Sequence, residues 1–419
     1  MRSFARCIWY FLLCTFALPA NAELTITVKS GSHDLHNAPV TVMLKPAKGQ
    51  DPNHPEPIYL TSGGEKSAIP CQVTPESGML RLTFLVADLP KGKQRVYHRA
   101  RGSQPHEYAP AAVDIKPNGT DLDCLIGGKL FTAYTTHSGP NKPFFYPILT
   151  PDGQHMTRRW PVEPDALPGE SHDHPHHRGL WFTHSSVNGV DFWMETDTNK
   201  QGRTINVGFP QTTSGPVYGG FQAQTEWRMP DNKLIATDTR NVRIYALPNN
   251  DRILDFEITL KPVGGPLTFG DNKDGTFGLR VPDVMAITPD RSSKFPGKGH
   301  IETSAGIKDK DAWGKRADWV DYWGPLGEKV YGVAIFDAPT NLRHPTTWHA
   351  RDYSLFTANP FGLHDFGLGA KGVGDYTVPL GEQITFRYRV LFHQGDTTAA
   401  HVADQYAAFA DPPEVSAHW

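Results

Sequence analysis

The chain has 419 residues, 20% of them charged, and a formal net charge of −3. Such a balanced charge gives no long-range attraction to a polyanion, so nucleic acid is excluded as an expected partner. The 39 glycines and 36 prolines are spread along the chain without a repeat, which is typical of turns between many strands and excludes a collagen-like or linker-like protein.

The N-terminal segment is typical of a secretory signal. Arg2 and Arg6 precede an apolar run at 7–18. This run is shorter than the roughly 20 residues that a membrane span needs. The Ala-Asn-Ala tripeptide at 20–22 then offers the small-x-small pattern that signal peptidase cleaves. We therefore expect residues 1–22 to be a signal peptide, and the mature protein to be periplasmic or extracellular. We expect no membrane insertion, because no later stretch is long and apolar enough for a span.

Two cysteines remain after the predicted signal, Cys71 and Cys124. In an oxidising compartment two such cysteines can form a disulfide, and the alternative is that they are two separate buried thiols. The distance between them decides the matter, and the sequence does not give it. Both alternatives therefore stay open.

The first part of the mature chain shows strand patterns. Residues 24–28 alternate in polarity, residues 40–44 are rich in β-branched side chains, and residues 79–89 alternate large apolar with polar side chains. Turn-rich stretches separate these segments. Together they predict an immunoglobulin-like β-sandwich over residues 23–118.

The remainder, residues 119–412, is also dominated by period-two patterns. A block of this size built from long antiparallel strands predicts a large sandwich domain. Residues 397–410 are the one convincing helix, because they are alanine-rich, follow a capping residue and end before two prolines. We therefore expect an all-β fold with one C-terminal helix. The clearest alternating runs lie at 129–137, 220–229, 236–247, 252–263 and 383–395.

A histidine cluster forms the first candidate site, in the stretch SHDHPHHRGLWF at 171–182. In an extended segment His172, His174 and His176 point to one side, which is good spacing for a divalent metal, and His174 and His176 are the first choices as ligands. The same cluster suits a metal-free pocket that grips hydroxyls and exchanges protons. The third alternative is a surface loop whose rings bond to nearby carbonyls.

Aromatic residues follow the histidine cluster directly. The stretch at 180–193 carries Trp181 and three more large aromatic side chains. Aromatic ring faces beside polar side chains are how proteins hold sugars, since the faces pack on C–H patches and the polar groups bind hydroxyls. The alternative is that these aromatic side chains belong to the core of the sandwich.

A second dense segment of polar and aromatic residues covers 343–366. Within it, His349 and Asp352 belong to the run HARD, where the carboxylate would orient the imidazole and raise its basicity. The alternative is a plain surface ion pair between Arg351 and Asp352. The Asn-Pro step at 359–360 favours a turn, which places the segment at a strand end.

A weaker candidate lies between these two segments, at 270–281. It offers Lys273 and Arg280 beside two aspartates. Charged turns of this kind are commonly solvated, and that is the alternative interpretation.

The stretches at 173–182, 271–281 and 347–362 resemble the signature segments of a group of secreted bacterial proteins that carry the label methane oxygenase PmoA. The resemblance covers about 120–400 and does not cover the N-terminal domain, and it implies a family that is in effect of unknown function. Membrane-bound methane monooxygenase subunits need several apolar spans, and this chain has none after its signal. The β-rich pattern of the family is similar to the galactose-mutarotase-like supersandwich, which occurs among sugar epimerases, polysaccharide lyases and glycosidase accessory domains.

We therefore expect an exported carbohydrate-active protein whose partner is a small carbohydrate or glycan. As an enzyme (a hydrolase, lyase or epimerase) it would use acid–base chemistry, with or without a divalent metal. His177 and His349 would exchange protons, Arg178 would hold a developing negative charge, and Asp352 would orient its neighbour. The substrate contacts that we expect are Asp173, Trp181, Lys273, Arg280, Trp348, Tyr353 and Asn359.

Two other classes of function stay open. The first is a non-catalytic glycan-binding protein, in which the histidines only bond hydroxyls. The second is a soluble copper or iron oxygenase, as the family label says.

Overall fold

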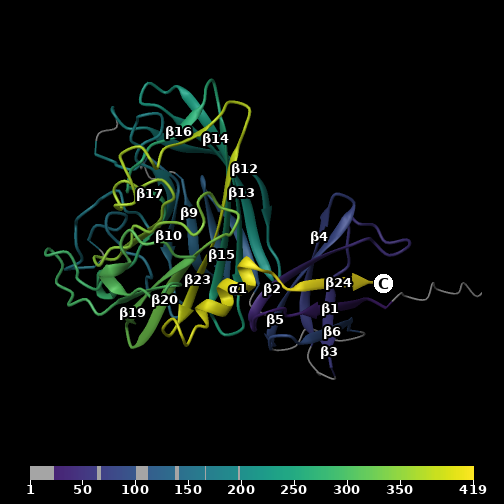
Figure 1. Ribbon diagram of the computed structural model, residues 1–419. Coiled ribbons are helices and arrows are strands. Elements are labelled where there is room, and N and C mark those ends of the chain that lie inside the picture. The colour runs from purple at the N-terminus through teal and green to yellow at the C-terminus, as the bar shows by residue number, and fades with distance from the viewer. Residues whose placement is uncertain (1–22, 64–67, 101–111, 137–140, 166, 197–198) are drawn as a thin grey trace, which may run out of the picture.

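The computed structural model describes residues 23–63, 68–100, 112–136, 141–165, 167–196 and 199–419 (Figure 1). The predicted signal, residues 1–22, lies outside them. Within the described part of the chain, no helix has the length and apolar character that a membrane crossing requires. Nearly all of the regular structure is antiparallel β-sheet, which confirms the prediction of an all-β sandwich fold.

The first sheet is built mainly from the N-terminal part of the chain, and the C-terminal strand completes it (Figure 1). Its strand order is β2-β5-β4-β3-β6-β1-β24. Alternating apolar side chains of these strands form a core of their own around residues such as Ile26, Leu82 and Phe84. The strands are β1 (Thr25–Lys29), β2 (Leu35–Leu44), β3 (Ile58–Ser62), β4 (Ile69–Glu76), β5 (Met79–Leu89), β6 (Gln94–Arg99) and β24 (Glu414–His418).

The second sheet also has seven strands, in the order β21-β17-β11-β10-β9-β8-β7. It brings together strands from distant parts of the sequence, because β17 and β21 add to the edge formed by β11. The strands are β7 (Val113–Asn118), β8 (Asp121–Ile126), β9 (Lys129–Thr135), β10 (Phe144–Ile148), β11 (Leu180–His184), β17 (Gly275–Arg280) and β21 (Leu355–Ala358).

The third sheet has eight strands, in the order β12-β13-β14-β15-β23-β20-β19-β18. A small sheet of β16 (Leu267–Phe269) and β22 (Tyr376–Val378) and two short 3-10 helices, η1 (Asp283–Met285) and η2 (Asp309–Ala312), lie in the connections. The strands of the third sheet are β12 (Arg203–Thr213), β13 (Tyr218–Arg228), β14 (Leu234–Ala246), β15 (Arg252–Pro262), β18 (His300–Thr303), β19 (Trp319–Leu326), β20 (Lys329–Asp337) and β23 (Ile384–Gln394).

The main core lies between the second and third sheets. Phe182 and Phe277 of the second sheet meet Phe256 and Tyr388 of the third, with ring centroids 4.6 Å apart for Phe277 and Tyr388 and 5.0 Å apart for Phe256 and Phe277. All four side chains are buried. Burying each of them stabilises the fold by about 1.5–3 kcal/mol, so this layer fixes which face of the second sheet is turned outward.

The two predicted domains are connected at their junction and again at the C-terminal end of the chain. β7 pairs with β8 in the second sheet, and β24 pairs with β1 in the first sheet. Leu85 of β5 packs in one apolar cluster with Val217 and Val402, which belong to the later part of the chain. Whether residues 23–118 and 119–412 fold as separate domains stays a prediction.

The C-terminal helix α1 spans Val402–Ala410, so it begins later than the predicted start at Thr397. His401 precedes it with a φ of 51°, in the left-handed region, which a continuing right-handed helix cannot use. Asp396 accepts a bond from the backbone N–H of Ala399 at 2.8 Å, so the capping residue closes a turn ahead of the helix.

Cys71 and Cys124 are two free, buried thiols, in two different apolar clusters. Burial raises the pKa of both thiols well above the ordinary range, because the thiolate would lose its hydration. The thiolate is the reactive form, so both side chains should be inert in the folded protein.

For a protein that starts at Glu23, we expect no reaction with a thiol reagent under native conditions and two reacting thiols per chain after unfolding without reductant. A colorimetric thiol assay with and without denaturant measures both numbers. Zero thiols in the unfolded, unreduced protein would show a disulfide and contradict this assignment.

Candidate functional site

Three strands of the second sheet bring the three sequence motifs together. β11 pairs with β17, which places Trp181 opposite Gly278, and β17 pairs with β21, which places Arg280 opposite Leu355. Because side chains alternate along a strand, these residues point away from the main core, on the outer face of the sheet. A Cβ atom at Gly278 would lie 2.5 Å from Thr357, so only glycine fits between the two neighbouring strands.

A half-buried carboxylate, that of Asp173, lies at the centre of the site. It accepts hydrogen bonds from Arg158, from the ring of His174 and, at 3.0 and 3.1 Å, from Arg280. Both arginine side chains are completely buried. Although burial alone would raise the pKa of Asp173, the bond from His174 and the two arginine charges hold it well below its usual range. Asp173 is therefore an anion that neutralises two buried cations, and both of its oxygens are already hydrogen-bonded within the protein.

The same network fixes the ring of His177. A guanidinium nitrogen of Arg280 lies 3.1 Å from its Nδ1. Since a guanidinium only donates, Nδ1 is the acceptor and the neutral ring carries its proton on Nε2. Burial, followed by the charges of neighbouring His176 and Arg280, lowers the pKa of His177 well below its ordinary value. His177 is therefore a neutral ring of defined tautomer, stacked at 5.5 Å on Trp181.

His176 lies beside it, with its ring centroid 4.4 Å from that of His177. Burial lowers the pKa of His176 to about 2, with a further contribution from the charge of Lys142. Its Nδ1 is buried and has no hydrogen-bond partner among the described residues. The indole Nε1 of Trp181 is buried without a partner within the same part of the chain.

A second ion network borders the histidines. Glu195 accepts a bond from Arg178 at 2.8 Å and another from the buried Lys142 at 2.5 Å. Lys142 lies 5.8 Å from the ring of Trp181. Burial lowers the pKa of Lys142, and the two neighbouring cations lower that of Glu195 against the opposing effect of burial. Arg178, which we expected to hold substrate charge, is thus paired with a carboxylate.

Sequence reasoning missed both Lys142 and Glu195. Neither lies in the three motif segments, and a lone lysine before a strand or a lone glutamate in a loop has no pattern that distinguishes it from a surface charge. The one available signal is the aromatic stretch that ends just before Glu195.

The segment at 343–366 reaches the histidine cluster through Tyr353. The ring of Tyr353 stacks on His174 at 5.3 Å, and the guanidinium groups of Arg280 and Arg351 lie 4.8 and 5.1 Å from its centroid. Arg280 also donates to the hydroxyl of Ser354 at 2.7 Å. The two histidine-containing segments therefore meet at His174 and Tyr353.

The partner of His349 differs from the one predicted. Its Nδ1 lies 3.0 Å from the carbonyl oxygen of Lys273 and 3.8 Å from the carboxylate of Asp274. Asp352 instead uses its backbone carbonyl to accept bonds from the backbone N–H groups at 287 and 288. The hypothesis that Asp352 orients His349 is therefore corrected, and the nearby carboxylate is Asp274.

The bond to Lys273 also defines the tautomer of His349. A carbonyl only accepts, so Nδ1 carries the proton and Nε2 keeps a lone pair. This Nε2 is buried, and the described residues offer it no hydrogen-bond partner. Burial lowers the pKa of His349 to about 3, with a smaller effect from the charge of Arg351.

Two residues that we expected to contact the substrate, Trp348 and Asn359, are not available to a ligand. Trp348 is completely buried in the main core, and its indole donates to the carbonyl of Ala317 at 2.9 Å. Asn359 is saturated, since its amide donates to the carbonyls of Asn272 and Lys273 and its oxygen accepts two backbone N–H groups. Neither side chain has a polar group left for a ligand.

The N–H groups of Arg280 are likewise hydrogen-bonded to Asp173, His177 and Ser354. The role of Arg280 is therefore to position the residues of the site. Lys273 remains half exposed, with its ammonium 3.3 Å from Asp274, and is still able to reach a ligand.

The metal hypothesis finds no preformed set of three ligands at the histidine cluster. Among the described residues, the set of three His, Cys or carboxylate side chains whose ligand atoms all lie within 4.8 Å of one another is His36, His401 and Asp404. Metal binding by His174 and His176 stays a prediction.

A groove of about 530 Å³ lies elsewhere, between the first and third sheets. Several of its charged residues are paired, as in Arg81–Glu76 and Arg387–Glu257, and its Asp255 pairs with Arg389. The unpartnered buried nitrogens of His176, Trp181 and His349 make the outer face of the second sheet the better candidate.

An antiparallel sandwich with a histidine-rich site on the outer face of one sheet is thus the class of protein that the structure defines. A family model, the family of unknown function DUF6807, matches residues 121–407, and the chain belongs to this family. The expectation of a family without assigned function over about 120–400 is confirmed, while the methane oxygenase label forms no part of that description.

No curated protein matches the sequence. Two solved structures are similar to the chain: an alpha-mannosidase from Enterococcus faecalis V583, with 11% identity and a TM-score of 0.41, and a protein in glycosyl hydrolase family 38 from Enterococcus faecalis, with 12% identity and a TM-score of 0.39. Each alignment covers 96% of this chain but only 46% and 48% of the solved chains, so the chain spans about half their length.

Replacing Asp173 by Asn should destabilise the protein strongly. Two buried arginines would lose their carboxylate, and breaking a buried pair in this way costs about 3–5 kcal/mol. Urea unfolding of D173N measures the loss. The matched control is D165N, an exposed carboxylate, which should change the free energy of unfolding by less than about 0.5 kcal/mol. Equal stability of the two variants would contradict the central role of Asp173.

The rings of His176 and His349 should stay neutral through the range of about pH 5 to 8, in which an ordinary histidine titrates. His344 should behave in the opposite way, because its bond to Asp337 raises its pKa and keeps it charged to higher pH. Ring NMR signals, assigned by their absence from H176A, H349A and H344A, report each titration. An inflection for His176 inside that range would refute the desolvated environment described above.

Proposed function

We propose that the protein is an exported carbohydrate-active enzyme that binds a sugar or glycoside on the outer face of the second sheet. The observation that carries the proposal is the set of buried ring nitrogens of His176, Trp181 and His349 that have no partner among the described residues. Such groups are costly unless a partner satisfies them. A sugar hydroxyl both donates and accepts, so it suits the indole N–H of Trp181 and the lone pair of His349 alike.

The tautomers of His349 and His177 give these two residues opposite hydrogen-bonding roles. His349 presents an unprotonated Nε2, which accepts a proton from the substrate. His177 presents an Nε2–H, which donates to the oxygen that becomes negative, while Arg280 holds its ring in place. A pKa of about 3 makes His349 a weak base in the free protein. Negative charge that develops on a bound substrate favours the protonated ring and raises this pKa during the reaction.

A non-catalytic glycan-binding protein is the second candidate. The observation that favours it is the low pKa of His176, about 2, because a ring that stays neutral serves better as a hydrogen-bonding group than as a proton carrier. Both candidates place a carbohydrate at the same site, and turnover separates them.

The test is a panel of glycans and glycosides, scored for binding by calorimetry and for turnover by product analysis. For a substrate that is turned over, H349A should lower kcat by about 100- to 10,000-fold, the range lost with a general acid or base. The control is H172A, since His172 is exposed and stacks on Trp160 without entering the network. Its activity should equal that of the unaltered protein.

The outcomes separate the candidates. Binding that H176A abolishes, without turnover of any compound, supports the glycan-binding protein. Neither binding nor turnover across the panel contradicts both candidates, and turnover that H349A leaves unchanged contradicts the assignment of the base.

A further inference from the structure

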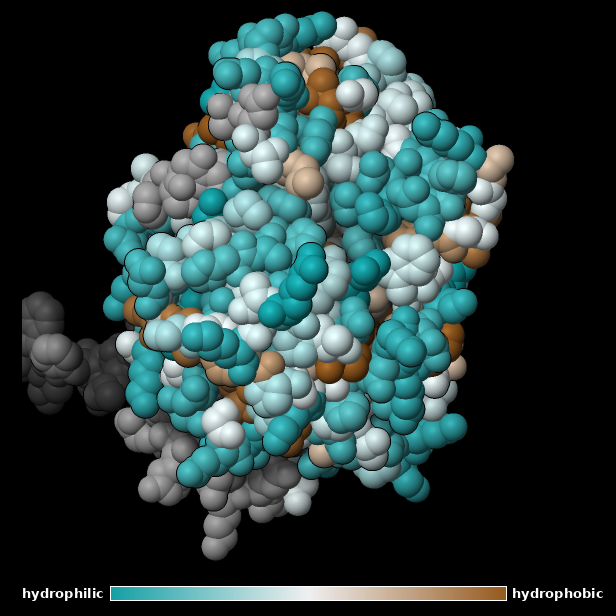
Figure 2. Space-filling model, turned by 90° about the vertical axis from the view of Figure 1, so that its left-hand side faces the viewer, coloured by the Kyte–Doolittle hydropathy of each residue, from teal (hydrophilic) through white to brown (hydrophobic). Residues whose placement is uncertain are grey.

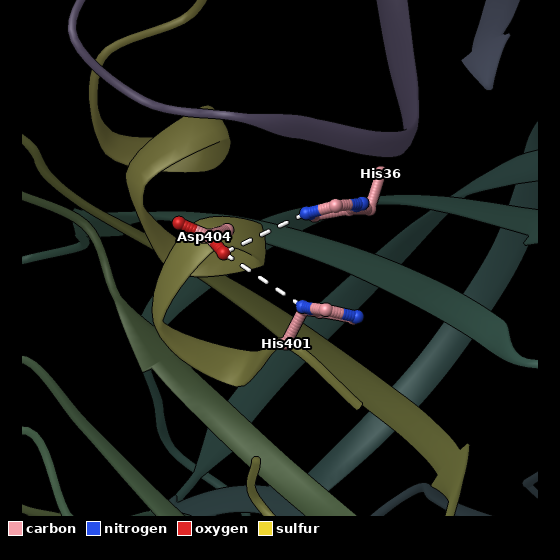
Figure 3. A group of neighbouring side chains, drawn as sticks. All are labelled: His36, His401 and Asp404. Carbon is pink, nitrogen blue, oxygen red and sulfur yellow. Dashed lines mark ion pairs between the residues drawn. The ribbon is translucent and has the colours of Figure 1, made fainter. Parts of the chain in front are cut away.

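We propose that His36, His401 and Asp404 form a binding site for a divalent transition metal of the zinc type, separate from the candidate active site. His36 lies on β2, and the other two residues lie at the start of α1. Nε2 of His36 is 3.6 Å from a carboxylate oxygen of Asp404, and Nδ1 of His401 is 3.9 Å from the same oxygen. Figure 3 shows both imidazole rings directed toward this carboxylate.

The chemistry of the three donors selects the class of ion. Two imidazole nitrogens and one carboxylate oxygen are ligands that zinc and its neighbours bind at about 2.0–2.2 Å, commonly with water in the fourth position. Magnesium and calcium prefer sites made of oxygen atoms. The ligand atoms all lie within 4.8 Å of one another, so a small movement of the side chains would let one ion contact all three.

Asp88 supplies an independent argument from the far side of His36. Its carboxylate lies 3.0 Å from Nδ1 of that ring. The bond places the ring proton on Nδ1 and leaves the lone pair of Nε2 directed at Asp404. A carboxylate that holds the second nitrogen of a ligating histidine is the usual outer partner of a protein metal site, because it fixes the tautomer and raises the basicity of the ring.

The two sides of the site are held together before any ion binds. The side-chain amide of Gln405 donates to the backbone carbonyl of His36 at 2.6 Å, which ties β2 to the first turn of α1. The rings of His36 and His401 are stacked, with centroids 4.1 Å apart and planes at 22°. The side chain of His401 is 52% exposed, so its ring is free to turn until its lone pair meets an ion shared with His36.

Such an ion would connect the first sheet to the last helix of the chain. The helix carries Val402, which packs in the same apolar cluster as Leu85 of β5. An ion that binds the folded protein and not the unfolded chain stabilises the fold by mass action. The proposed site is therefore a metal clip that holds β2 against α1.

The experiment titrates zinc chloride into untagged, chelator-treated protein of the full mature chain and follows binding by calorimetry. We expect one zinc equivalent that H401A and D404N each weaken at least tenfold. H54A is the matched control, since His54 is an exposed histidine that also pairs with an aspartate, Asp51, and is not one of the three proposed ligands. Zinc should raise the melting temperature of the unaltered protein and of H54A, but not that of H401A.

The double variant H174A/H176A separates this site from any metal at the histidine cluster, because it should keep the zinc equivalent that H401A loses. An anomalous map of a zinc-soaked crystal should place the ion between His36 and Asp404. Unchanged affinity in H401A and D404N, absence of zinc binding, or an ion found only at the histidine cluster would each overturn the proposal. Loss of turnover on the glycan panel has no bearing on it.

Discussion

The burial of two arginines under one carboxylate is the constraint on which the candidate site depends. An unpaired guanidinium in the interior would cost several kcal/mol, so Arg158 and Arg280 can stay buried only while Asp173 is ionised between them. Arg280 then has one direction left for its remaining N–H groups, toward His177 and Ser354. The tautomer of His177 and the position of Ser354 are both consequences of this pairing.

The sandwich decides on which side this network lies. Phe182 and Phe277 fill the main core, and strand alternation therefore turns Trp181 and Arg280 to the outer face. On that face the strands meet loops instead of another sheet, and loops can supply polar groups from distant parts of the sequence. The fold thus provides a rigid floor of strands, and the connections provide the histidines and their charged neighbours.

The sequence was sufficient for the class of fold and for marking the motif segments, because alternation and local density of polar residues are visible in a linear pattern. It was insufficient where the direction of a single side chain matters. Trp348 and Asn359 have the residue types of a sugar site, yet one fills the core and the other ties down a turn. Lys142 and His36 could not be found at all, since their partners Glu195 and Asp404 come from distant parts of the chain and meet them only in the folded structure.

The balance of buried charge at the candidate site bears on the kind of ligand it takes. Four cations lie around the histidines, and the charges of four carboxylates act on them, while His176 and His177 remain neutral because burial lowers their pKa. A phosphate or another strong anion would leave an uncompensated charge in this environment, whereas an uncharged polyhydroxyl compound adds none. A negative charge that develops during a reaction can be met in this environment by directed N–H groups such as that of His177. The groups in this balance are Lys142, Arg158, Arg178 and Arg280 with Glu170, Asp173, Glu195 and Asp283.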